Sequence, residues 1–417
     1  APGVARHEEV SLPDPRVRVA HGTRRHPAAG VDAERHEQRL VGLRVDRDRG
    51  SEHIESLASP GYFVADLTQD RPLAFVASTE PWELLEFDPE AIFEAEAQRL
   101  DKLLSQRGGE ADEDIEGWLT MAADQFVVAP GSRLEEQALA RASGNEARTI
   151  IAGYHWFTDW GRDTMISLEG LTLCTGRHQE ARAILRTFAN YVKDGLIPNL
   201  FPEGERMGLY HTADATLWYF HAISRYYRVT NDRETLLTLL PVLRSVLEHH
   251  VRGTHFGIGV DAKDGLLRAS AEGYQLTWMD ALVDGWVVTP RRGKPVEIQA
   301  LWYNALRCME EWEVLAGQTP SRWRDLAEQV QRSFNERFWI AAEGYLYDVI
   351  DGERGHDTAF RPNQVLSIAL PHPVLQEDRW RSVVDLAADR LLTPVGLRSL
   401  SRDHPDYKPM YFGDLRA

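Results

Sequence analysis

The sequence is poor in cysteine and contains no long apolar run. Cys174 and Cys308 are its two thiols among 417 residues, which indicates a reducing compartment, and they lack the spacing of metal ligands. No segment reaches the roughly 18 to 20 apolar residues that a membrane span requires. The first ten residues, APGVARHEEV, lack the apolar stretch of a secretory signal. We therefore expect a cytoplasmic protein.

Positive charge is also scarce. The chain has 47 Lys and Arg against 64 Asp and Glu, which gives a formal net charge of −17 at pH 7. A surface this acidic repels phosphate backbones and anionic lipid headgroups, so we expect neither nucleic acid nor a membrane as partner. A neutral, hydroxyl-rich substrate needs no charge complementarity and remains open. The oligomeric state is not indicated by these features.

Several well-known catalytic motifs are missing. The sequence contains no G-x-x-x-x-G-K-[ST] phosphate loop, no H-E-x-x-H pair and no G-x-S-x-G serine elbow. The stretch FGIGV, residues 256–260, has two glycines but not the third that a dinucleotide-binding turn needs. These absences argue against nucleotide, zinc-protease and serine-hydrolase chemistry.

The first part of the chain differs in composition from the rest. Residues 1–50 are rich in Arg, His and Asp and are expected to be poorly structured. GYFVADL and LAFVAST then read as strands joined by a turn. DPEAIFEAEAQRLDKLLSQRGG reads as a helix. We therefore expect part of a β-rich domain over residues 1–88 and a helical domain over residues 89–417.

The helical segments follow one another in pairs of different character. The first member is often apolar nearly all round, as in MISLEGLTLC and VEIQALWYNAL. The second carries more charge, as in HQEARAILRTF and RWRDLAEQVQRSF. A helix that is apolar all round is buried, whereas an amphipathic helix lies outside. The pattern predicts a mainly α protein built as a double-layered barrel, with an irregular bundle or an α-solenoid as alternatives.

Polar residues recur where the presumed inner helices begin. Arg162 and Asp163 open the first, Asp214 lies in the first turn of the next, and Glu297 lies in the first turn of a third. Inner helices that run the same way would bring these side chains to one end of a barrel. Alternatively, the carboxylates cap their helices or complement the helix dipole. Each helix start also has a tryptophan nearby, whose face suits the C–H surface of a sugar: Trp160, Trp218 and Trp302.

Asp280 lies in a loop, close in sequence to Trp278, Met279 and Leu282. A carboxylate in apolar surroundings is desolvated and tends to hold its proton, as a general acid for glycoside cleavage must. Carboxylates at helix N-termini are instead pushed toward the ionised form. Asp280 is therefore the candidate acid and Asp163 a candidate binder, although an Asp that merely stabilises its loop would look the same.

These residues lie in stretches that resemble the amylo-α-1,6-glucosidase domain of prokaryotic glycogen debranching enzymes. The matching stretches run in family order from about residue 115 to 417: WGRDTMISLEGLTLCTGR, GLIPNLFPEG, HTADATLWYFHAI, TWMDA, GKPVEIQALWYNAL, RPNQVLSIALP and TPVGLRSL. GYFVADLTQDRPLAFVASTE also looks like the end of that family's β-rich N-terminal domain. The resemblance implies an (α/α)6 barrel of twelve helices. It also implies an inverting glucosidase that removes single α-1,6-linked glucose stubs from a branched α-glucan such as glycogen or limit dextrin.

The resemblance also implies roles for individual residues. Asp280 in TWMDA would be the general acid. Arg162 and Asp163, with Trp160 beside them, would hold the hydroxyls of the terminal glucose. The remaining candidates would bind substrate or shape the site: Asp214, Trp278 and Glu297. The roles of Arg361 and Arg398, which also lie in family motifs, stay open.

One departure from the family concerns the second carboxylate. An inverting hydrolase needs a base that activates water roughly 6.5 to 9.5 Å from the acid. In the family this base follows a segment that comes after the point where this chain ends, at YFGDLRA. We therefore expect the general base to lie outside the chain and the barrel to be truncated at its C-terminal end.

Two other functions stay open at this stage. The chain can be a relative in the same barrel class, either another α-glucoside hydrolase or an inverting phosphorylase in which phosphate replaces the base. It can also be a catalytically incomplete homologue that binds glucan. Because the chemistry implied by the resemblance requires only carboxylates and water, we expect no metal and no organic cofactor.

Overall fold

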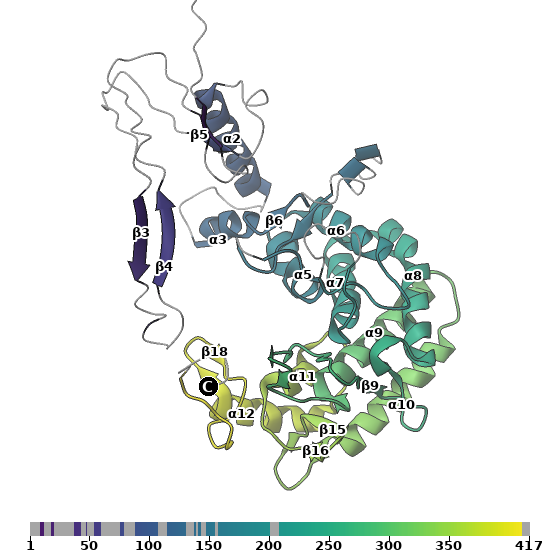
Figure 1. Ribbon diagram of the computed structural model, residues 1–417. Coiled ribbons are helices and arrows are strands. Elements are labelled where there is room, and N and C mark those ends of the chain that lie inside the picture. Colours follow the sequence, from purple (N-terminus) through teal and green to yellow (C-terminus); the bar gives the residue numbers. More distant parts are fainter. Residues whose placement is uncertain are drawn as a thin grey trace, which may run out of the picture. The chain divides into compact units, whose positions relative to one another are not determined.

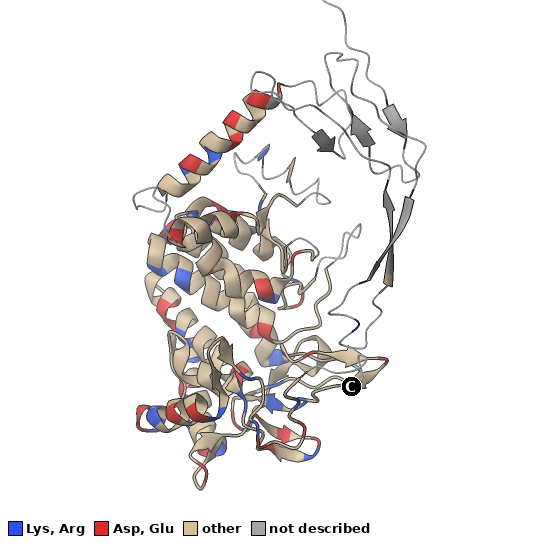
Figure 2. Ribbon diagram, turned by 90° about the vertical axis from the view of Figure 1, so that its left-hand side faces the viewer, with Lys and Arg blue, Asp and Glu red and all other residues tan. Residues whose placement is uncertain are grey.

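A computed structural model describes the following residues: 9–11, 18–20, 37–42, 47, 54–59, 76–78, 88–106, 115–130, 137–138, 141–142, 147–154, 157–200 and 208–410. The chain divides into two compact units, residues 1–101 with 410–417 and residues 102–409. This division falls within helix α2 (Pro89–Gln106), whereas composition placed the boundary just before it. In Figure 2 the ribbon of this helix carries several red segments, which mark acidic residues. In the described part of the chain, no helix is both long and apolar enough to cross a membrane.

Five short strands belong to the first unit (Figure 1). An antiparallel sheet has the order β1-β2-β5, and β3 pairs antiparallel with β4. Their bounds are β1 (Glu9–Ser11), β2 (Arg18–Ala20), β3 (Glu37–Gly42), β4 (Ile54–Ser59) and β5 (Val76–Ser78). Three of these strands lie in residues 1–50, where composition predicted little structure. Strand pairing supplies backbone hydrogen bonds that composition does not reveal. The expected strand at 61–67 lies outside the described residues, and β5 lies within the second expected strand.

The second unit is mainly helical. Its longer helices are α3 (Ile115–Asp124), α5 (Gly161–Leu168), α6 (His178–Asn190), α7 (Asp214–Thr230), α8 (Arg233–Arg252), α9 (Val296–Leu315), α10 (Ser321–Arg337) and α12 (Trp380–Leu391). Short helical segments are the π-helical η2 (Glu169–Leu173), which continues α5, then η3 (His255–Gly257), η4 (Pro362–Val365), α11 (Leu366–Ala369) and η5 (Glu377–Arg379). These helices confirm most of the predicted pairs, with ends shifted by a few residues.

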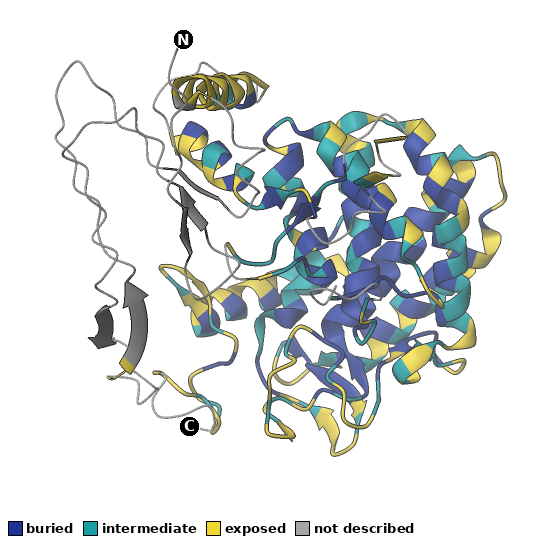
Figure 3. Ribbon diagram, turned by 45° about the horizontal axis from the view of Figure 1, so that its top comes forward, coloured by how far each residue is buried: buried dark blue, intermediate teal, exposed yellow. Residues whose placement is uncertain are grey.

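The helices of this unit form an inner and an outer row. Along the inner row α5 contacts α7, α7 contacts α9, and α9 contacts α11, while α6, α8 and α10 pack against these from outside (Figure 1). Fifteen of the 20 residues of α9 are buried, against five of the 17 in α10. In Figure 3 buried residues gather in the interior of the helical unit and exposed residues on its outside. The predicted alternation of buried and amphipathic helices is therefore present in this pair.

Short strands connect the helices and shape one end of the unit. They are β6 (Val127–Val128) with β7 (Thr149–Ile150), β8 (Gly259–Val260) with β9 (Leu267–Arg268), β10 (Leu282–Val283) with β11 (Trp286–Val287), β12 (Lys294–Pro295) with β15 (Val349–Gly352) and β16 (Gly355–Asp357), β13 (Trp339–Ile340) with β14 (Tyr345–Leu346), and β17 (Leu392–Thr393) with β18 (Gly396–Leu397). Helix α3 ends at Asp124, and Val127 and Val128, which favour strands, pair with β7.

Aromatic residues pack within the inner row and between the two rows. Phe220 on α7 stacks on Trp312 of α9, with ring centroids 6.0 Å apart. Trp302 on α9 stacks on His250 of α8 at 5.8 Å and donates its indole N–H to the carbonyl of Gly265. Trp302 is fully buried. It is therefore a core residue rather than a platform for a sugar.

Candidate active site

Helix α5 begins against a neighbouring backbone segment. The N–H of Gly161 donates to the carbonyl oxygen of Asn199 at 2.9 Å, and Trp160 pairs with Leu200 in a β-bridge. A Cβ atom added at Gly161 would run into the carbonyl oxygen of Pro198. Glycine thus permits this close approach. It also brings the side-chain oxygen of Asn199 to 3.3 Å from the backbone nitrogen of Arg162.

Arg162 joins two carboxylates that are distant in sequence. Its Nε donates to Asp214 Oδ2 at 2.8 Å, and its Nη1 donates to Asp280 Oδ2 at 2.9 Å. The side chains of Arg162 and Asp214 are 9% and 1% exposed. Burial alone would lower the pKa of Arg162, but the two carboxylates outweigh it and raise that pKa. Burial is also the main reason why the pKa of Asp214 is raised, despite Arg162.

Buried polar atoms around this ion pair remain available for hydrogen bonds. Within the described part of the chain, four atoms there have no hydrogen-bond partner: Arg162 Nη2, Asp214 Oδ1, Asn199 Nδ2 and Thr212 Oγ1. Such atoms are costly to bury and usually find partners. They comprise two donors, one acceptor and one hydroxyl that can do both, a set that a hydroxyl-rich ligand can satisfy.

Asp163 and His211 complete the electrostatic surroundings of Arg162. Burial raises the pKa of Asp163, Arg162 opposes this, and the charges of Asp214 and Asp280 add to it. Burial lowers the pKa of His211; Asp280 opposes this and Arg162 adds to it, so the ring is mainly neutral at pH 7. The described groups around Arg162 thus comprise three carboxyls and a mainly neutral imidazole.

Asp280 differs from the expectation drawn from its sequence neighbours. Its side chain is 40% exposed and forms an ion pair with Arg162, whereas the sequence predicted a desolvated carboxyl. Trp278 is 40% exposed and Leu282 51% exposed, so neither encloses it. The reason is the path of the chain: the loop leads directly into the β10–β11 hairpin, where the N–H of Val288 donates to the carbonyl of Ala281 at 3.1 Å.

Trp278, two residues before Asp280, is held through its indole. Its Nε1–H donates to Asn363 Oδ1 at 2.8 Å, and Asn363 Nδ2 donates to Asp348 Oδ1 at 2.8 Å. Asn363 and Asp348 are buried, in η4 and just before β15. The ring of Trp278 is therefore oriented while part of it stays exposed.

Glu297 lies apart from Arg162, in a second buried ion-pair network. Arg291 donates from Nη2 to Glu297 Oε2 at 2.6 Å, pairs through Nη1 with Oε1, and contacts both oxygens of Asp348, at 2.7 and 3.0 Å. Burial would lower the pKa of Arg291, but the two carboxylates outweigh it and raise that pKa. Both Glu297 oxygens are thus engaged by the protein itself. Arg291 also donates to Thr277 Oγ1 at 3.3 Å, next to Trp278.

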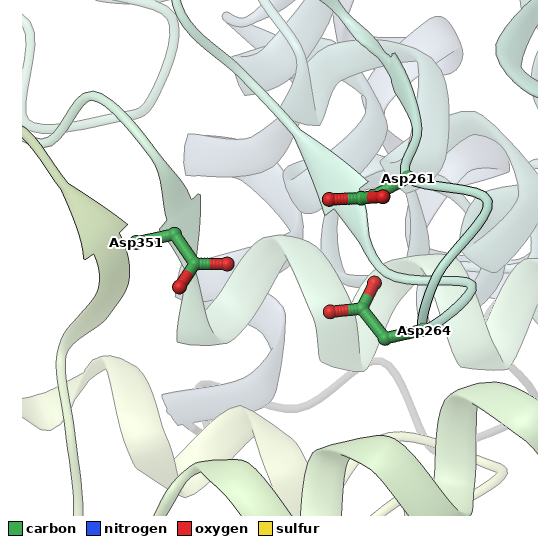
Figure 4. A group of neighbouring side chains, drawn as sticks. All are labelled: Asp261, Asp264 and Asp351. Atoms are coloured by element: carbon green, nitrogen blue, oxygen red, sulfur yellow. The ribbon is translucent and has the colours of Figure 1, made fainter.

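A third charge cluster anchors the start of α9. The carboxylates of Asp261, Asp264 and Asp351 turn toward one another (Figure 4), and one oxygen of each lies within 4.8 Å of the others. Lys294 Nζ lies 3.0, 2.7 and 2.9 Å from them. Such a triad of carboxylates resembles the ligands of a cation. Here the positive charge comes from the buried Lys294 ammonium together with Arg268 and Arg337, so the cluster is an internal salt-bridge network that includes β12.

The structure therefore brings some predicted residues together and separates others. Arg162, Asp214 and Asp280 are in direct contact, with Asp163 close enough to affect and be affected by their charges. Glu297 belongs to the network around Arg291. Sequence reasoning missed the polar partners that the structure adds: Asn199, His211, Arg291, Asp348 and Asn363. Asn199 and Asn363 are both buried. They lie in GLIPNLFPEG and RPNQVLSIALP, two of the stretches that carry the family resemblance, and that membership was the available sequence signal.

Comparison with known proteins places the chain among carbohydrate-active enzymes. The yeast Saccharomyces cerevisiae glycogen debranching enzyme is 25% identical over 384 residues, covering 70% of this chain and 24% of the yeast protein. The chain thus spans about a quarter of that relative's length.

Solved structures with a similar chain fold are more distant. A family GH78 rhamnosidase of a Bacillus species has 16% identity and a TM-score of 0.46, covering 67% of this chain and 26% of its own. A GH63 mannosylglycerate hydrolase of Thermus thermophilus, in complex with glucose, has 15% identity and a TM-score of 0.45, covering 66% and 81%.

A protein-family model supplies the assignment. The model described as amylo-alpha-1,6-glucosidase matches residues 121–417, a range that includes Arg162, Asp214 and Asp280. Because this match takes in well over half of the residues, the chain belongs to the amylo-alpha-1,6-glucosidase family of glycoside hydrolases.

Proposed function

We propose that this chain is a glucosidase that removes α-1,6-linked glucose from a branched α-glucan, the activity of a debranching enzyme. The family supports hydrolysis of a glycosidic bond, and the yeast relative supports glycogen or limit dextrin as substrate. The helix pairs of residues 102–409 would belong to an (α/α)6 barrel, with the site at the end where α5 and α7 begin.

The observation that carries the proposal is the buried Arg162–Asp214 ion pair with its free atoms. Arg162 Nη2 can donate to a sugar hydroxyl, and Asp214 Oδ1 can accept from one, without breaking the pair. Asp163, Asn199 and Thr212 add further polar groups within the same part of the site. This arrangement suits a terminal glucose, which offers adjacent hydroxyls and no charge. Trp160 and Trp278 would contact its C–H faces.

Asp280 is the proposed general acid. Its carboxyl is accessible and is tied to the proposed sugar-binding residue Arg162. In the reaction the C1–O6 bond breaks, the proton of Asp280 passes to O6, and water attacks C1 from the opposite face. The products are β-glucose and a glucan shortened by one residue. We assign no residue to the base that activates the water.

Charge favours hydrolysis over phosphorolysis in this site. With Asp280 carrying the proton that it donates, the two carboxyls of Asp163 and Asp214 face the single guanidinium of Arg162, and His211 is mainly neutral. A phosphate dianion is repelled by such surroundings. Phosphorylases of the same barrel class would need a cationic phosphate site, and the described residues around Arg162 do not provide one.

The proposal is tested by measuring free glucose released from phosphorylase-limit dextrin. Glucose release without added phosphate requires a base within residues 1–417 in addition to the acid. If the wild-type chain releases glucose, we expect Asp280→Asn to release at least about 100-fold less, because general acid catalysis contributes roughly that much or more. Asp385→Asn, an exposed change on α12, is the control.

Other outcomes would replace the proposal. Release of glucose 1-phosphate that requires added phosphate would identify a phosphorylase. Binding of dextrin with no glucose released, in a chain that melts cooperatively, would identify a glucan-binding homologue.

A further inference from the structure

We propose that Asn363 is a positioning residue that sets the orientation of Trp278 and, through it, of the Asp280 loop. This inference rests on the proposed function insofar as Asp280 is the acid. It assigns to the RPNQ stretch a role that its sequence alone left open. Asn363 itself does not touch the substrate.

The first support is the pair of hydrogen bonds that Asn363 makes. Its amide oxygen accepts from the Trp278 indole at 2.8 Å, and its amide nitrogen donates to Asp348 at 2.8 Å. The two contacts fix which end of the amide is oxygen, because an indole N–H can only donate and a carboxylate can only accept. The amide therefore matches donor to acceptor on both sides.

The second support is the rigidity of what lies behind Asn363. Asp348 receives two hydrogen bonds from Arg291, which is itself paired with Glu297 on the inner helix α9. All three charged side chains are 2% exposed or less. Buried networks whose members are satisfied are rigid. Asn363 thus connects an exposed tryptophan to a fixed point in the core.

The third support is that the same network holds the loop at a second position. Arg291 Nη1 donates to Thr277 Oγ1 at 3.3 Å, and that hydroxyl accepts from the Met279 N–H at 3.4 Å. Asn363 Nδ2 also lies 3.6 Å from the Met279 sulfur. The three residues that precede Asp280 are therefore all tied to the network, whereas Asp280 itself contacts Arg162. The loop is held from both sides of the acid.

A double-mutant cycle tests the connection. Trp278→Phe removes the indole N–H but keeps an aromatic face, and Asn363→Leu removes both amide contacts at similar volume. We expect each to lower kcat/KM on limit dextrin by about tenfold, as for loss of one buried hydrogen bond. The double variant should be no worse than either single variant, because both break one connection. The fall should appear mainly in kcat, and the basic limb of the pH–rate profile should move equally in both single variants.

Trp380→Phe is the matched control, since its indole donates to the backbone carbonyl of Leu375 rather than to Asn363. We expect it to leave kcat/KM and the pH profile unchanged. The inference would be overturned if the reductions in kcat/KM caused by Trp278→Phe and Asn363→Leu multiplied in the double variant. It would also be overturned if either single variant kept the wild-type kcat/KM.

Two complications are separated by the design. If Asn363→Leu does not fold, Trp278→Phe alone decides, because its partly exposed ring can be changed without emptying the core. If the wild-type chain releases no glucose, the proposed function fails, and the cycle is read instead from the affinity for glucose by calorimetry. Non-additive losses of affinity would still support the coupling, and additive ones would overturn it.

Discussion

Arg162 and Asp214 form a buried ion pair between the first turns of two neighbouring inner helices, with Nε and Oδ2 2.8 Å apart. The residues are 52 positions apart in the sequence. Breaking a buried pair leaves an uncompensated charge, which makes such a contact costly to lose. Because Arg162 also reaches Asp280, one side chain links the proposed sugar-binding groups to the proposed acid.

Replacing Arg162 by lysine should weaken sugar binding. A lysine ammonium is a compact charge without the planar fork that reaches Asp214 and Asp280 at once. We expect Arg162→Lys to reduce the affinity for glucose by about 10- to 100-fold, as for the loss of one or two charged hydrogen bonds. Calorimetric titration with glucose measures the change. Arg381→Lys on the exposed face of α12 is the control, and equal affinities in the two variants would contradict the role of Arg162.

Gly161→Ala should disturb the start of α5. The new Cβ would collide with the Pro198 carbonyl oxygen, which is backbone and has little freedom to move. We expect a loss of about 1 to 3 kcal/mol in the free energy of unfolding, the usual cost of overpacking, together with weaker glucose binding. Urea unfolding measures the first effect. Gly170→Ala, where a Cβ meets nothing within 4 Å, should be neutral or stabilising, and equal destabilisation by both would refute this account.

The pH dependence of glucose binding should reveal Asp163. Its pKa is raised by burial, so on acidification it takes up a proton at a higher pH than an ordinary aspartate. If its ionised form accepts from a sugar hydroxyl, binding should be strong above that pKa and should weaken as the pH falls through it. Asp163→Asn should bind more weakly at neutral pH and lose this dependence. If the affinity for glucose still falls at acidic pH in Asp163→Asn as it does in the wild type, another group causes the pH dependence.

Lys294→Met should destabilise the protein. It removes the buried ammonium shared by three carboxylates that Arg268 and Arg337 still contact, so we expect a cost of about 1 to 3 kcal/mol at pH 7, as for the loss of charged hydrogen bonds. Lys263→Met, an exposed lysine in the same turn, should cost little. Urea unfolding at pH 7 compares the two, and similar values for both variants would contradict the importance of the cluster.

The sign of the pH effect follows from the pKa shifts in this cluster. Despite the burial of their carboxyls, the cationic partners lower the pKa of Asp261 and Asp351. Their contribution is present above the unfolded pKa of about 3.9 and is lost as the pH falls through the folded values. The carboxylate partners raise the pKa of Lys294 despite its burial. The contribution of Lys294 to the free energy of unfolding is therefore fully present below the unfolded pKa of about 10.4 and is lost as the pH rises through the folded pKa. The difference between wild type and Lys294→Met should therefore shrink in strong acid and strong base.

The helices could be predicted from sequence because their signal is local. The apolar all-round stretch VEIQALWYNAL lies in α9, and the more highly charged stretch RWRDLAEQVQRSF lies in α10. The strands in residues 1–50 could not be predicted in this way, because their partners are set by pairing rather than by composition. The need for glycine at position 161 could not be predicted from the sequence, because it arises from the backbone of residues 198–199, which packs against it in the folded chain.

Part of the site was also within reach of the sequence. Arg162 and Asp214 both lie at starts of inner helices, so their meeting follows once those helices are adjacent. The surroundings of Asp280 did not follow, because residues close in sequence need not enclose a side chain in a loop. Likewise, Glu297 lies in the first turn of its helix as Asp214 does, so the sequence suggested the same role for both. Its ion pair with Arg291 could not be predicted, because Arg291 lies in the loop before α9.

The most direct test of the acid assignment varies the leaving group. Asp280→Asn keeps an oxygen that can accept from Arg162 but cannot supply a proton. We predict a loss of roughly 100- to 10,000-fold on limit dextrin, and only a small loss on α-glucosyl fluoride, since fluoride leaves without a proton. Parallel rates of glucose release from both substrates measure this. An equal loss on both substrates, or none on dextrin, would contradict the assignment of Asp280 as the general acid.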